Sequence, residues 1–527
     1  MVEKPQASVR RPPPQVAAFM DTVNKKALRI YEAAVSNNLN LDFPIDIGSA
    51  NAQVFTSIWA GRARARTLER DNPYAFAILQ SYQNNVCGDD PFRLEMNIGH
   101  YDAQDKWVKH QKENRMIEQA WKEAQFPENC TASRDVSRLE LDCQVILSMI
   151  RDAGYIAEHI NAFPKNKFHY ALRCWEIDRL DHWWNGVNEI TGNQIKHSIE
   201  LDEFGGPVGY WLLTTHPGDI YTSMAQKQKY RRYVPAEDLI VFHDLRSRAE
   251  QLISMPRFSS IIQRLHRMDQ FDIAHVTAAV WSACKPLFII KKFPTAMEYL
   301  PESVKAAMVD VDKIQNESKL SPGETESLNY GEEPYLVDPK FPVEAAAAFK
   351  KEHLRAAAAG SGAAYHVIAN DLESVNFSSG RLGLEEFRTG CKIIQRHFIL
   401  SFRRKHFNEW LRNALTFGTI NLPISRLEEF QLAANFHGRR WPYMQPLQDA
   451  QADAVLLKNR LASRDSLLSE SDRGGDYQQV ASELEADNDT DKIHNLDPFD
   501  PDGIQAGKDS GDETTVEETP AEKLGKT

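Results

Sequence analysis

The sequence predicts a protein of the α+β class, and three observations lead to this prediction. Apolar residues recur at the helical period in both terminal parts of the chain. Short alternating runs separated by glycine-containing turns occupy the middle, at residues 168–216. The 527 residues, 42% hydrophobic and 26% charged, match the averages of folded proteins, and their number exceeds what one hydrophobic core usually serves. We therefore expect two or more packed regions.

The N-terminal part is predicted to be mostly helical. Residues 1–40 form an arm with one helix at 16–36, which Asn37, Asn38 and Pro44 end by turn chemistry. Further helices are expected at residues 49–86, 107–124 and 135–153.

The first of these helices contains four arginines in a short run, Arg62, Arg64, Arg66 and Arg70. They could contact phosphates or the carboxylates of a partner. They could equally form a solvated helix face that pairs with nearby acids such as Glu69, which is the commoner role of such a run.

The middle of the chain is predicted to be a β-rich insert. Strands are expected at residues 170–177, 194–201, 208–215 and 239–243. Gly192-Asn193 and Gly205-Gly206-Pro207 supply the turns between the first three.

Three long helices follow the strands. The first spans residues 259–284, and the second begins at Pro342 and stops at Gly360-Ser361-Gly362. Between them, residues 291–340 are loop-rich, with one helix near 302–312. A short polar loop at 376–380 precedes the third helix, residues 382–416, which is rich in arginine.

The second long helix is crowded with alanine, at residues 345–348 and 356–359. A surface of methyl groups lets neighbouring helices approach closely, which suits several copies packed around an axis. Alanine is also the best helix former whatever it packs against, so this pattern alone does not decide between the two interpretations.

The C-terminal part is predicted to contain two short helices at 447–486, around Gly474-Gly475, followed by a solvated tail. The net charge is −12, and residues 487–527 contain 12 acidic and 4 basic residues. Positive and negative charges nearly balance in the rest of the chain, so we do not expect the protein as a whole to bind phosphates through a net positive charge.

Motifs for nucleotide, metal or nucleophile chemistry are not found. The Gly-Lys-Thr at 525–527 has no phosphate loop before it and no helix after it, and Gly360-Ser361-Gly362 follows a helix instead of a strand. Ser378-Ser379-Gly380 lacks the leading glycine of a nucleophile elbow. His182-Trp183-Trp184 and His216-Pro217-Gly218-Asp219 lack metal-ligand spacing and are interpreted as structural. We expect neither cofactor nor metal.

The six cysteines contain no Cys-x-x-Cys pair, which argues against a zinc ribbon or a disulfide framework and favours a reducing, intracellular setting. No signal peptide is expected at the N-terminus. Residues 271–290 are apolar but contain Asp272, His275, Lys285 and Pro286, so we expect a buried helix of a soluble protein and no membrane span.

Several pieces, taken in order, resemble the lambda-type phage portal proteins over about residues 60–484. Two departures, Met255-Pro256-Arg257 and Gln445-Pro446, affect only local turn shapes. The pieces that carry the resemblance are Arg62 to Asn72-Pro73-Tyr74, Asn85-Val86-Cys87-Gly88, Gly206-Pro207-Val208-Gly209-Tyr210, His216-Pro217-Gly218-Asp219, Val234-Pro235-Ala236 with His243, Asn329-Tyr330-Gly331 before Phe341-Pro342, Asp371, Asn376 to Arg381, Trp410-Leu411 and Trp441-Pro442.

The resemblance implies a portal fold with a β-containing wing, a two-helix stem, a clip, a long wing helix and a helical crown. The implied boundaries are an N-terminal arm at 1–40, the wing at 41–257, stem helices at 258–290 and 341–362, the clip at 291–340, a tunnel loop at 363–381, the wing helix and its return at 382–446, the crown at 447–486 and the acidic tail at 487–527. The tunnel-loop residues expected at the channel are Asn370, Asn376, Phe377, Ser378, Ser379, Gly380 and Arg381.

The function implied by the resemblance is a ring, expected to be a dodecamer, at one vertex of the virion capsid after assembly in the host cytoplasm. Double-stranded DNA would be held by encirclement, entering during packaging and leaving during ejection. The implied partners are the terminase packaging ATPase, head-completion and tail proteins and the major capsid protein. An acidic chain suits this role because like charge lets the duplex slide.

Two alternatives stay open at this point. A soluble nucleic-acid-processing enzyme would use the Arg62 to Arg70 cluster for backbone contact and acidic residues for a metal. A purely structural shell protein would have no axial hole.

Overall fold

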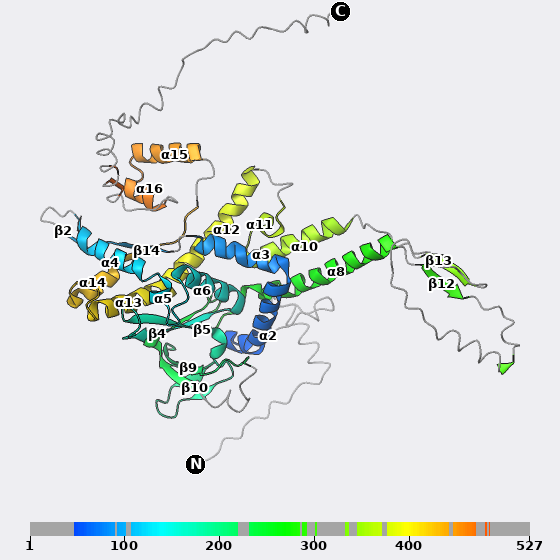
Figure 1. The fold of residues 1–527 in the computed structure, drawn as a ribbon, viewed down its shortest axis with the longest axis horizontal. Coiled ribbons are helices and arrows are strands. Elements are labelled where there is room, and N and C mark those ends of the chain that lie inside the picture. Colours follow the sequence, from blue (N-terminus) through cyan, green and yellow to red (C-terminus); the bar gives the residue numbers. More distant parts are fainter. Residues whose placement is uncertain are drawn as a thin grey trace, which may run out of the picture. The chain divides into compact units, whose positions relative to one another are not determined.

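The computed structural model describes residues 47–89, 92–101, 107–219, 231–284, 287–291, 301–302, 332–336, 345–371, 377–441, 446–470, 480–481 and 484 (Figure 1). The predicted helix at 16–36, all but residue 302 of the helix predicted near 302–312, Asn376, the Gly474-Gly475 break and the tail at 487–527 lie outside these residues. The chain divides into two units, residues 1–53 and 54–527, and the second contains nearly all described elements.

The predicted helix at 49–86 is present but divided. Helix α2 (Ala50–Asp71) ends at Asn72, whose side chain accepts a hydrogen bond of 2.8 Å from the Ala75 amide and so caps α3 (Pro73–Tyr82). Proline suits the first helical position because its missing amide hydrogen has no partner there in any case. A π turn, η2 (Gln83–Cys87), extends α3 and ends at Gly88, whose φ is +71°.

A mixed segment follows these helices. Three short strands, β1 (Arg93–Met96), β2 (Gly99–Tyr101) and β3 (Trp107–Lys109), precede α4 (Gln111–Glu123), α5 (Pro127–Cys130) and α6 (Arg138–Asp152). The helix predicted at 107–124 is therefore correct from Gln111 onward, whereas residues 107–109 pair with β2 instead. The helix predicted at 135–153 is confirmed, with Ser137 as its N-cap.

The β-rich insert is confirmed as two antiparallel sheets. One has the order β11-β4-β5, from β4 (Tyr155–Asn161), β5 (Tyr170–Glu176) and β11 (Leu239–Phe242). The other has the order β10-β9-β8-β7-β6, from β6 (Gly186–Val187), β7 (Gln194–Lys196), β8 (Ile199–Leu201), β9 (Pro207–Leu213) and β10 (Arg231–Pro235).

The single strand predicted at 194–201 is wrong. It is a hairpin of β7 and β8, turned at His197 and Ser198, which both have positive φ (52° and 65°). Two-residue hairpin turns of type I′ require positive φ at both central residues, and glycine and asparagine are the residues that usually indicate them, so His197 and Ser198 did not predict a turn. The Ser198 hydroxyl donates a hydrogen bond of 2.7 Å to the Asp181 carbonyl, which stabilises the turn.

Two further strand pairs join parts that are distant in sequence. Strand β1 pairs with β14 (Ala434–His437), and β12 (Leu287–Lys291) pairs with β13 (Glu332–Leu336), both antiparallel. The second pair joins the two ends of the segment 292–331.

The long predicted helices are confirmed with shifted ends. They are η5 (Arg257–Ser260) with α8 (Ile262–Cys284), α10 (Ala345–Ser361), and α12 (Phe377–Phe398) continued by the π turn η7 (Ile399–Arg403) and α13 (Arg404–Thr416). Helix α10 stops where Gly362 adopts a φ of +77°, as its glycines predict. The short α11 (Tyr365–Ala369) follows it, and α14 (Leu427–Leu432), α15 (Pro446–Lys458) and α16 (Arg464–Glu470) complete the described helices.

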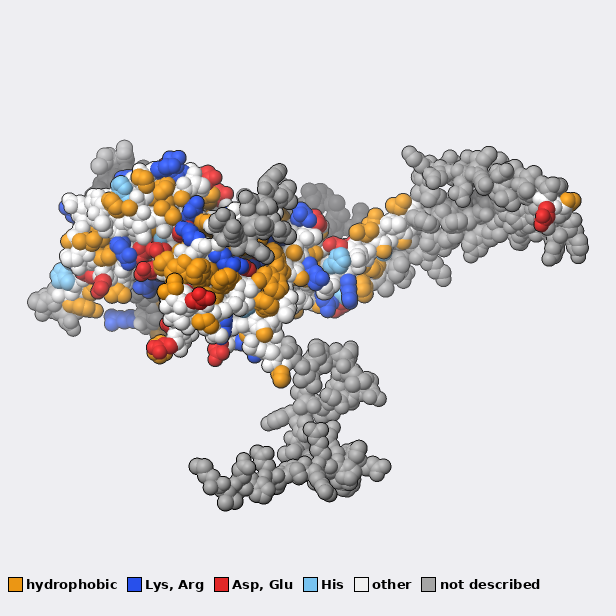
Figure 2. Space-filling model, turned by 90° about the horizontal axis from the view of Figure 1, so that it is seen from below, with side chains coloured by type: hydrophobic (Ala, Val, Ile, Leu, Met, Phe, Trp, Pro, Cys, Tyr) orange, Lys and Arg blue, Asp and Glu red, His pale blue; other side chains and the backbone are white. Residues whose placement is uncertain are grey.

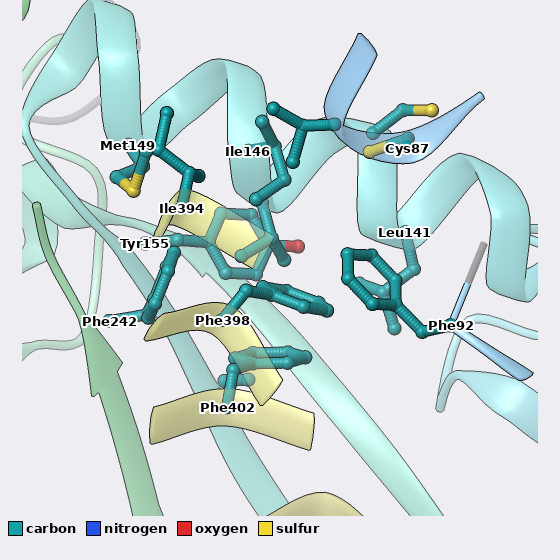
Figure 3. Packing of buried hydrophobic residues seen from close by; sticks show 14 of the residues in the cluster. Cys87, Phe92, Leu141, Ile146, Met149, Tyr155, Phe242, Ile394, Phe398 and Phe402 are labelled. Carbon is teal, nitrogen blue, oxygen red and sulfur yellow. The ribbon is translucent and has the colours of Figure 1, made fainter. Parts of the chain in front are cut away.

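The main hydrophobic core lies between α3, α6, the α12–α13 helix and one face of the three-stranded sheet. Figure 3 shows its centre, where Phe398 and Phe402 stack at 5.2 Å between ring centroids, with Phe92 at 4.5 Å from Phe398. Tyr155 belongs to this core, whereas its neighbour Ile156 belongs to a second cluster with α2 and the five-stranded sheet, because successive strand residues face opposite sides.

Among the described helices, none has a stretch both long and apolar enough to cross a membrane. The expectation that residues 271–290 form a buried helix is wrong in the single chain. Ile273, Val276 and Val280 on α8 are 67%, 61% and 54% exposed.

A buried histidine makes stability depend on pH. His159 on β4 is buried, and its Nδ1 lies 2.7 Å from the Tyr170 hydroxyl. Burial, followed by the charges of Lys405 and Arg412, lowers the pKa of His159 to about 4. Unfolded histidine has a pKa of about 6.5, so between about pH 6.5 and 4 the unfolded state binds the extra proton.

The free energy of unfolding is therefore expected to fall as pH drops through this window, by up to about 1.4 kcal/mol per pH unit for this one proton. Urea unfolding at several pH values measures the slope, and His159→Gln should reduce it by the part that this proton contributes. The rest of the slope remains, because burial also lowers the pKa of His182, His243 and His406. His266→Gln, at an exposed position on α8, is the matched control and should leave the slope unchanged. An equal slope in wild type and His159→Gln would contradict the assignment.

Candidate functional site

Helices α8 and α10 lie side by side where residues 264–272 of α8 meet residues 349–353 of α10 (Figure 1). Lys350 pairs with Asp272 at 2.8 Å, Arg264 Nη1 lies 2.9 Å from His353 Nδ1, and the rings of Phe271 and Phe349 lie 5.0 Å apart. Charged and aromatic contacts thus hold the two helices together along one face.

The end of α10 packs closely against the residues that precede α8. A Cβ added to Gly360 would lie 2.5 Å from the Ile261 side chain, so only glycine fits there without displacement. The Ser260 hydroxyl donates to the Gly360 carbonyl at 3.0 Å and satisfies one of the last carbonyls of the helix.

The alanines of α10 serve two purposes. Ala357 and Ala358 are buried in the main core, whereas Ala347, Ala348 and Ala359 are exposed. Figure 2 shows hydrophobic side chains at the surface of the α8–α10 pair, among basic side chains and histidines. In the single chain this surface, composed of Ile273, Val276, Val280 and Phe349 with the exposed alanines, has no cover within the described residues.

The predicted site segment begins at α11, which several contacts fix. The Tyr82 hydroxyl donates to the Ser361 carbonyl at 2.6 Å, just before the turn into α11, and Ile368 is buried. The Tyr365 hydroxyl donates to Asp371 at 2.8 Å, and Lys351 pairs with the same carboxylate at 3.0 Å. Desolvation, followed by the Asp371 carboxylate, raises the pKa of Tyr365 to about 12, so its hydroxyl stays a donor.

The predicted site residues fall on two sides of residues 372–376. Asn370 is exposed and adopts the left-handed conformation (φ 49°) that ends α11, while Asn376 lies outside the described residues. Phe377, Ser378, Ser379, Gly380 and Arg381 form the first turns of α12, and Gly380 is buried. The loop predicted at 376–380 is therefore wrong for 377–380.

Tertiary contacts explain this early helix start, since they routinely override the low helix propensity of serine and glycine. Phe387 of α12 is buried against Tyr82, with ring centroids 5.5 Å apart. Tyr82 of α3 thus contacts both the end of α10, at Ser361, and α12, at Phe387.

The arginine run of α2 does not form the expected solvated face. Arg62 is 1% exposed; its Nε donates to the Asp152 carbonyl at 2.6 Å and Nη1 lies 3.2 Å from Asp178. Arg66 pairs with Asp152 at 2.6 Å and with Asp178 at 2.5 Å. Only Arg64 and Arg70 are exposed, and Arg70 pairs with Asp71. The run is mainly structural, which removes Arg62 and Arg66 as contacts for nucleic acid.

The structural interpretation of His182 is supported by the same network. Burial, followed by the charge of Arg62, lowers the pKa of His182 well below its usual value. The neutral ring therefore accepts a hydrogen bond from Arg62 Nη1 at 2.5 Å.

His216 has carboxylate neighbours that the sequence did not reveal. Its Nε2 lies 3.1 Å from Glu176 and 3.8 Å from Asp178, and these three residues are close enough to hold a metal ion. Arg66 already places its guanidinium 2.5 Å from Asp178 and 3.6 Å from Glu176. Because this cation occupies the position beside both carboxylates, we assign the cluster to ion pairing.

A second buried network joins α6 to the π turn η7. Asp142 pairs with Arg403, and Arg138 Nε lies 3.5 Å from the same carboxylate. The guanidinium of Arg138 lies over the Trp121 ring at 4.4 Å and that of Arg403 over Phe398 at 5.1 Å. One carboxylate therefore balances two buried arginines.

Comparisons with known proteins agree on one family. A family model described as "Phage portal protein, lambda family" matches residues 37–395. A probable portal protein of Halomonas phage phiHAP-1 is 25% identical over 478 residues, which cover 90% of this chain and 89% of that protein. Portal protein B of Escherichia phage lambda is 21% identical over 468 residues, covering 82% and 84%.

Solved structures with a similar chain come from gene transfer agent (GTA) particles. One is the neck of an empty GTA particle with C6 symmetry, with a TM-score of 0.39 and 12% identity, covering 77% of this chain and 91% of that one. Another is the virion of a native GTA particle, with a TM-score of 0.36 and 12% identity, covering 81% and 95%.

Proposed function

Because the chain belongs to the lambda family of phage portal proteins, we propose that twelve copies close into a ring at one capsid vertex and that double-stranded DNA passes through its bore. As a member of this family the chain is a structural component of the virion, connects head to tail, takes part in DNA packaging and is not an enzyme. The dodecamer, the vertex and the bore are the parts that we propose.

The proposal assigns the elements to portal subdomains. Helices α8 and α10 are the stem, residues 291–340 the clip, residues 363–381 the tunnel loop, residues 382–446 the wing helix with its return, and α15 with α16 part of the crown. Two observations support the stem and clip boundaries. Helices α8 and α10 contact each other, as the two stem helices would, and β12 pairs with β13, which joins the two ends of the proposed clip.

The observation that carries the ring is the uncovered apolar surface of the α8–α10 pair. Ile273, Val276 and Val280 are more than half exposed, although burying such a side chain contributes about 1.5–3 kcal/mol. Soluble chains seldom expose a contiguous apolar surface without a partner. Neighbouring copies packed around an axis would cover it, and the exposed alanines would let them approach.

In this ring DNA is retained by encirclement. Residues 370–381 would border the narrow part of the bore, where Asn370, Asn376, Ser378 and Ser379 offer hydrogen bonds without sequence information and Arg381 reaches a phosphate. The net charge of −12 disfavours tight binding of phosphates overall and so favours sliding. The sequence contains no phosphate-binding nucleotide loop, so we propose that a separate terminase ATPase supplies the work of packaging. We propose further that head-completion and tail proteins dock on the ring afterwards and that the major capsid protein surrounds it.

Electron microscopy of the purified protein tests the ring. We expect annular particles with a central hole of at least about 20 Å, wide enough for a double helix. Ile273→Glu combined with Val276→Glu should abolish rings and leave monomers, because each charge would have to be buried between neighbours. Ile190→Glu, at a 94% exposed loop position, is the matched control and should leave rings intact. Monomers of wild type at high concentration, or rings of the double variant, would refute the proposal.

A further inference from the structure

A groove of about 490 Å³ lies between the end of α12, the start of α13 and the residues that follow β14. Five basic side chains line it: Lys392, Arg396, Arg404, Arg439 and Arg440. No aspartate or glutamate lines the groove. Within the described part of the chain none of the five has a carboxylate partner, whereas Arg62, Arg66 and Arg403 each have one. The groove therefore concentrates positive charge on the surface of a protein whose net charge is −12.

Basic residues follow one side of the α12–α13 helix. Lys392 and Arg396 are four residues apart on α12 and line the groove, and Arg388, four residues before Lys392, lies at its edge. Each four-residue step turns by about 40° around a regular α-helix. The π turn Ile399–Arg403 winds more slowly, since its hydrogen bonds span five residues, so Arg404 stays on the groove side. We call these four residues the stripe, and at about 1.5 Å per residue it is roughly 24 Å long.

The same π turn separates two kinds of arginine. Arg403 is buried against Asp142, whereas Arg404, the next residue, lines the groove. The backbone thus directs Arg403 toward its carboxylate partner in the core and Arg404 toward the groove.

The groove is held rigid by uncharged contacts. Gln395 donates to the carbonyls of Val86 and Arg439 at 3.0 and 3.2 Å. A Cβ added to Gly88 would lie 2.3 Å from Arg439 Cδ, so the stem of that arginine packs directly on the glycine. Trp441 donates to Asn85 at 2.9 Å. The packed stem of Arg439 therefore loses little freedom when an anion binds.

Arg388, at the edge of the groove, is affected by the neighbouring positive charges. Arg388 lies over the Trp441 ring at 5.4 Å, and its Nε is buried without a hydrogen-bond acceptor among the described residues. Burial lowers the pKa of Arg388; Glu385 opposes this shift and the charge of Arg439 adds to it. An anion in the groove would offset the repulsion between Arg388 and Arg439 and favour the charged guanidinium.

We propose that this groove binds the phosphodiester backbone of double-stranded DNA outside the bore of the ring. The inference rests on the proposed function, which places the chain beside DNA. A row of cations without carboxylate partners among the described residues matches a polymer with a phosphate at every step, and phosphate contacts of this kind carry no sequence information. The acidic residues 487–527 hold 12 carboxylates among 41 residues, a lower charge density than that of the duplex. Arg404 and Arg439 would each hold phosphate oxygens through two N–H groups.

Covalently closed DNA circles test the groove on the assembled ring, because a closed circle cannot thread a closed bore. We expect wild-type rings to bind circles with an affinity that falls steeply as salt rises. The double variant Arg396→Ser, Arg404→Ser should weaken binding by roughly tenfold per lost contact at about 0.1 M salt, and should lower the slope of log K against log salt by about 1 per contact. Electron microscopy of each variant reports whether rings form.

The matched control is Arg64→Ser with Arg115→Ser. It removes the same charge from two exposed helix positions outside the groove and should bind circles as wild type does. Equal affinity and slope for the groove variant and wild type would overturn the inference while leaving the ring intact. If the groove variant loses its rings while the control variant keeps them, the groove is a contact between copies. If DNA binds only after residues 487–527 are deleted, the groove holds the acidic tail. Either result overturns the proposal. Absence of rings in wild type refutes the proposed function instead.

Discussion

Asp142→Ala is expected to lower the free energy of unfolding by about 3–5 kcal/mol, because it leaves two buried arginines without their counter-charge. Asp142 and Arg403 are almost completely buried, and Arg138 has the same carboxylate beside it. Charges that cannot reach water must either unfold their surroundings or draw water into the core. The midpoint of urea unfolding, followed by tryptophan fluorescence, measures the loss.

Asp71→Ala is the matched control for this experiment. Asp71 also pairs with an arginine, Arg70, but both side chains are more than half exposed, so the expected change is about 0–1 kcal/mol. Equal midpoints for Asp142→Ala and wild type would show that the α6–η7 network is not buried as described.

Asn376→Trp and Ser379→Trp are expected to leave rings intact and to reduce DNA packaging to background. Each substitution adds an indole to every copy at the segment proposed to border the bore, so the added bulk recurs around the axis and narrows the passage. The measurement is the amount of DNA protected from nuclease in assembled heads, alongside electron microscopy of the rings. Ile190→Trp introduces the same ring at a 94% exposed loop position and should package normally.

Normal packaging by both tryptophan variants would refute the assignment of residues 370–381 to the bore. Broken rings would instead show that these residues pack between copies. The two outcomes separate a channel role from an interface role.

The sequence predicted the helical framework well because each long helix carries its own local signals. Apolar periodicity and Pro286 delimit α8, alanine content and Gly362 delimit α10, and the α12–α13 helix follows from its amphipathic pattern. The strands at 170–176, 207–213 and 239–242 were found for the same reason, since turn residues border them. The α+β class follows from these elements.

Features that depend on tertiary contacts were not predictable. Arg62 and Arg64 are chemically identical and two residues apart, yet one is buried against Asp178 and the other is exposed, which only the packing of α2 decides. His216 meets Glu176 and Asp178 across the sheet region, with no spacing signal in the chain. The hairpin at His197-Ser198 and the early start of α12 lack their usual turn and helix residues, so local propensity pointed the wrong way.

The role of the candidate site stays a prediction, and the sequence predicts its local structure only in part. Asn370 ends α11 at an exposed position, whereas Phe377–Gly380, predicted as a loop, are helical. The basic groove escaped detection because its cations come from residues 392–404 and 439–440, which only the pairing of β1 with β14 and the π turn bring together.

The pairing of β12 with β13 has a consequence for how such a protein can diversify. Five residue pairs fasten the two ends of the intervening segment, so its length can change between relatives at a small entropic cost while the helices on the other side keep their register. Insertions or deletions within residues 292–331 are therefore expected to leave the pairing of β12 with β13, and the helices next to it, unchanged.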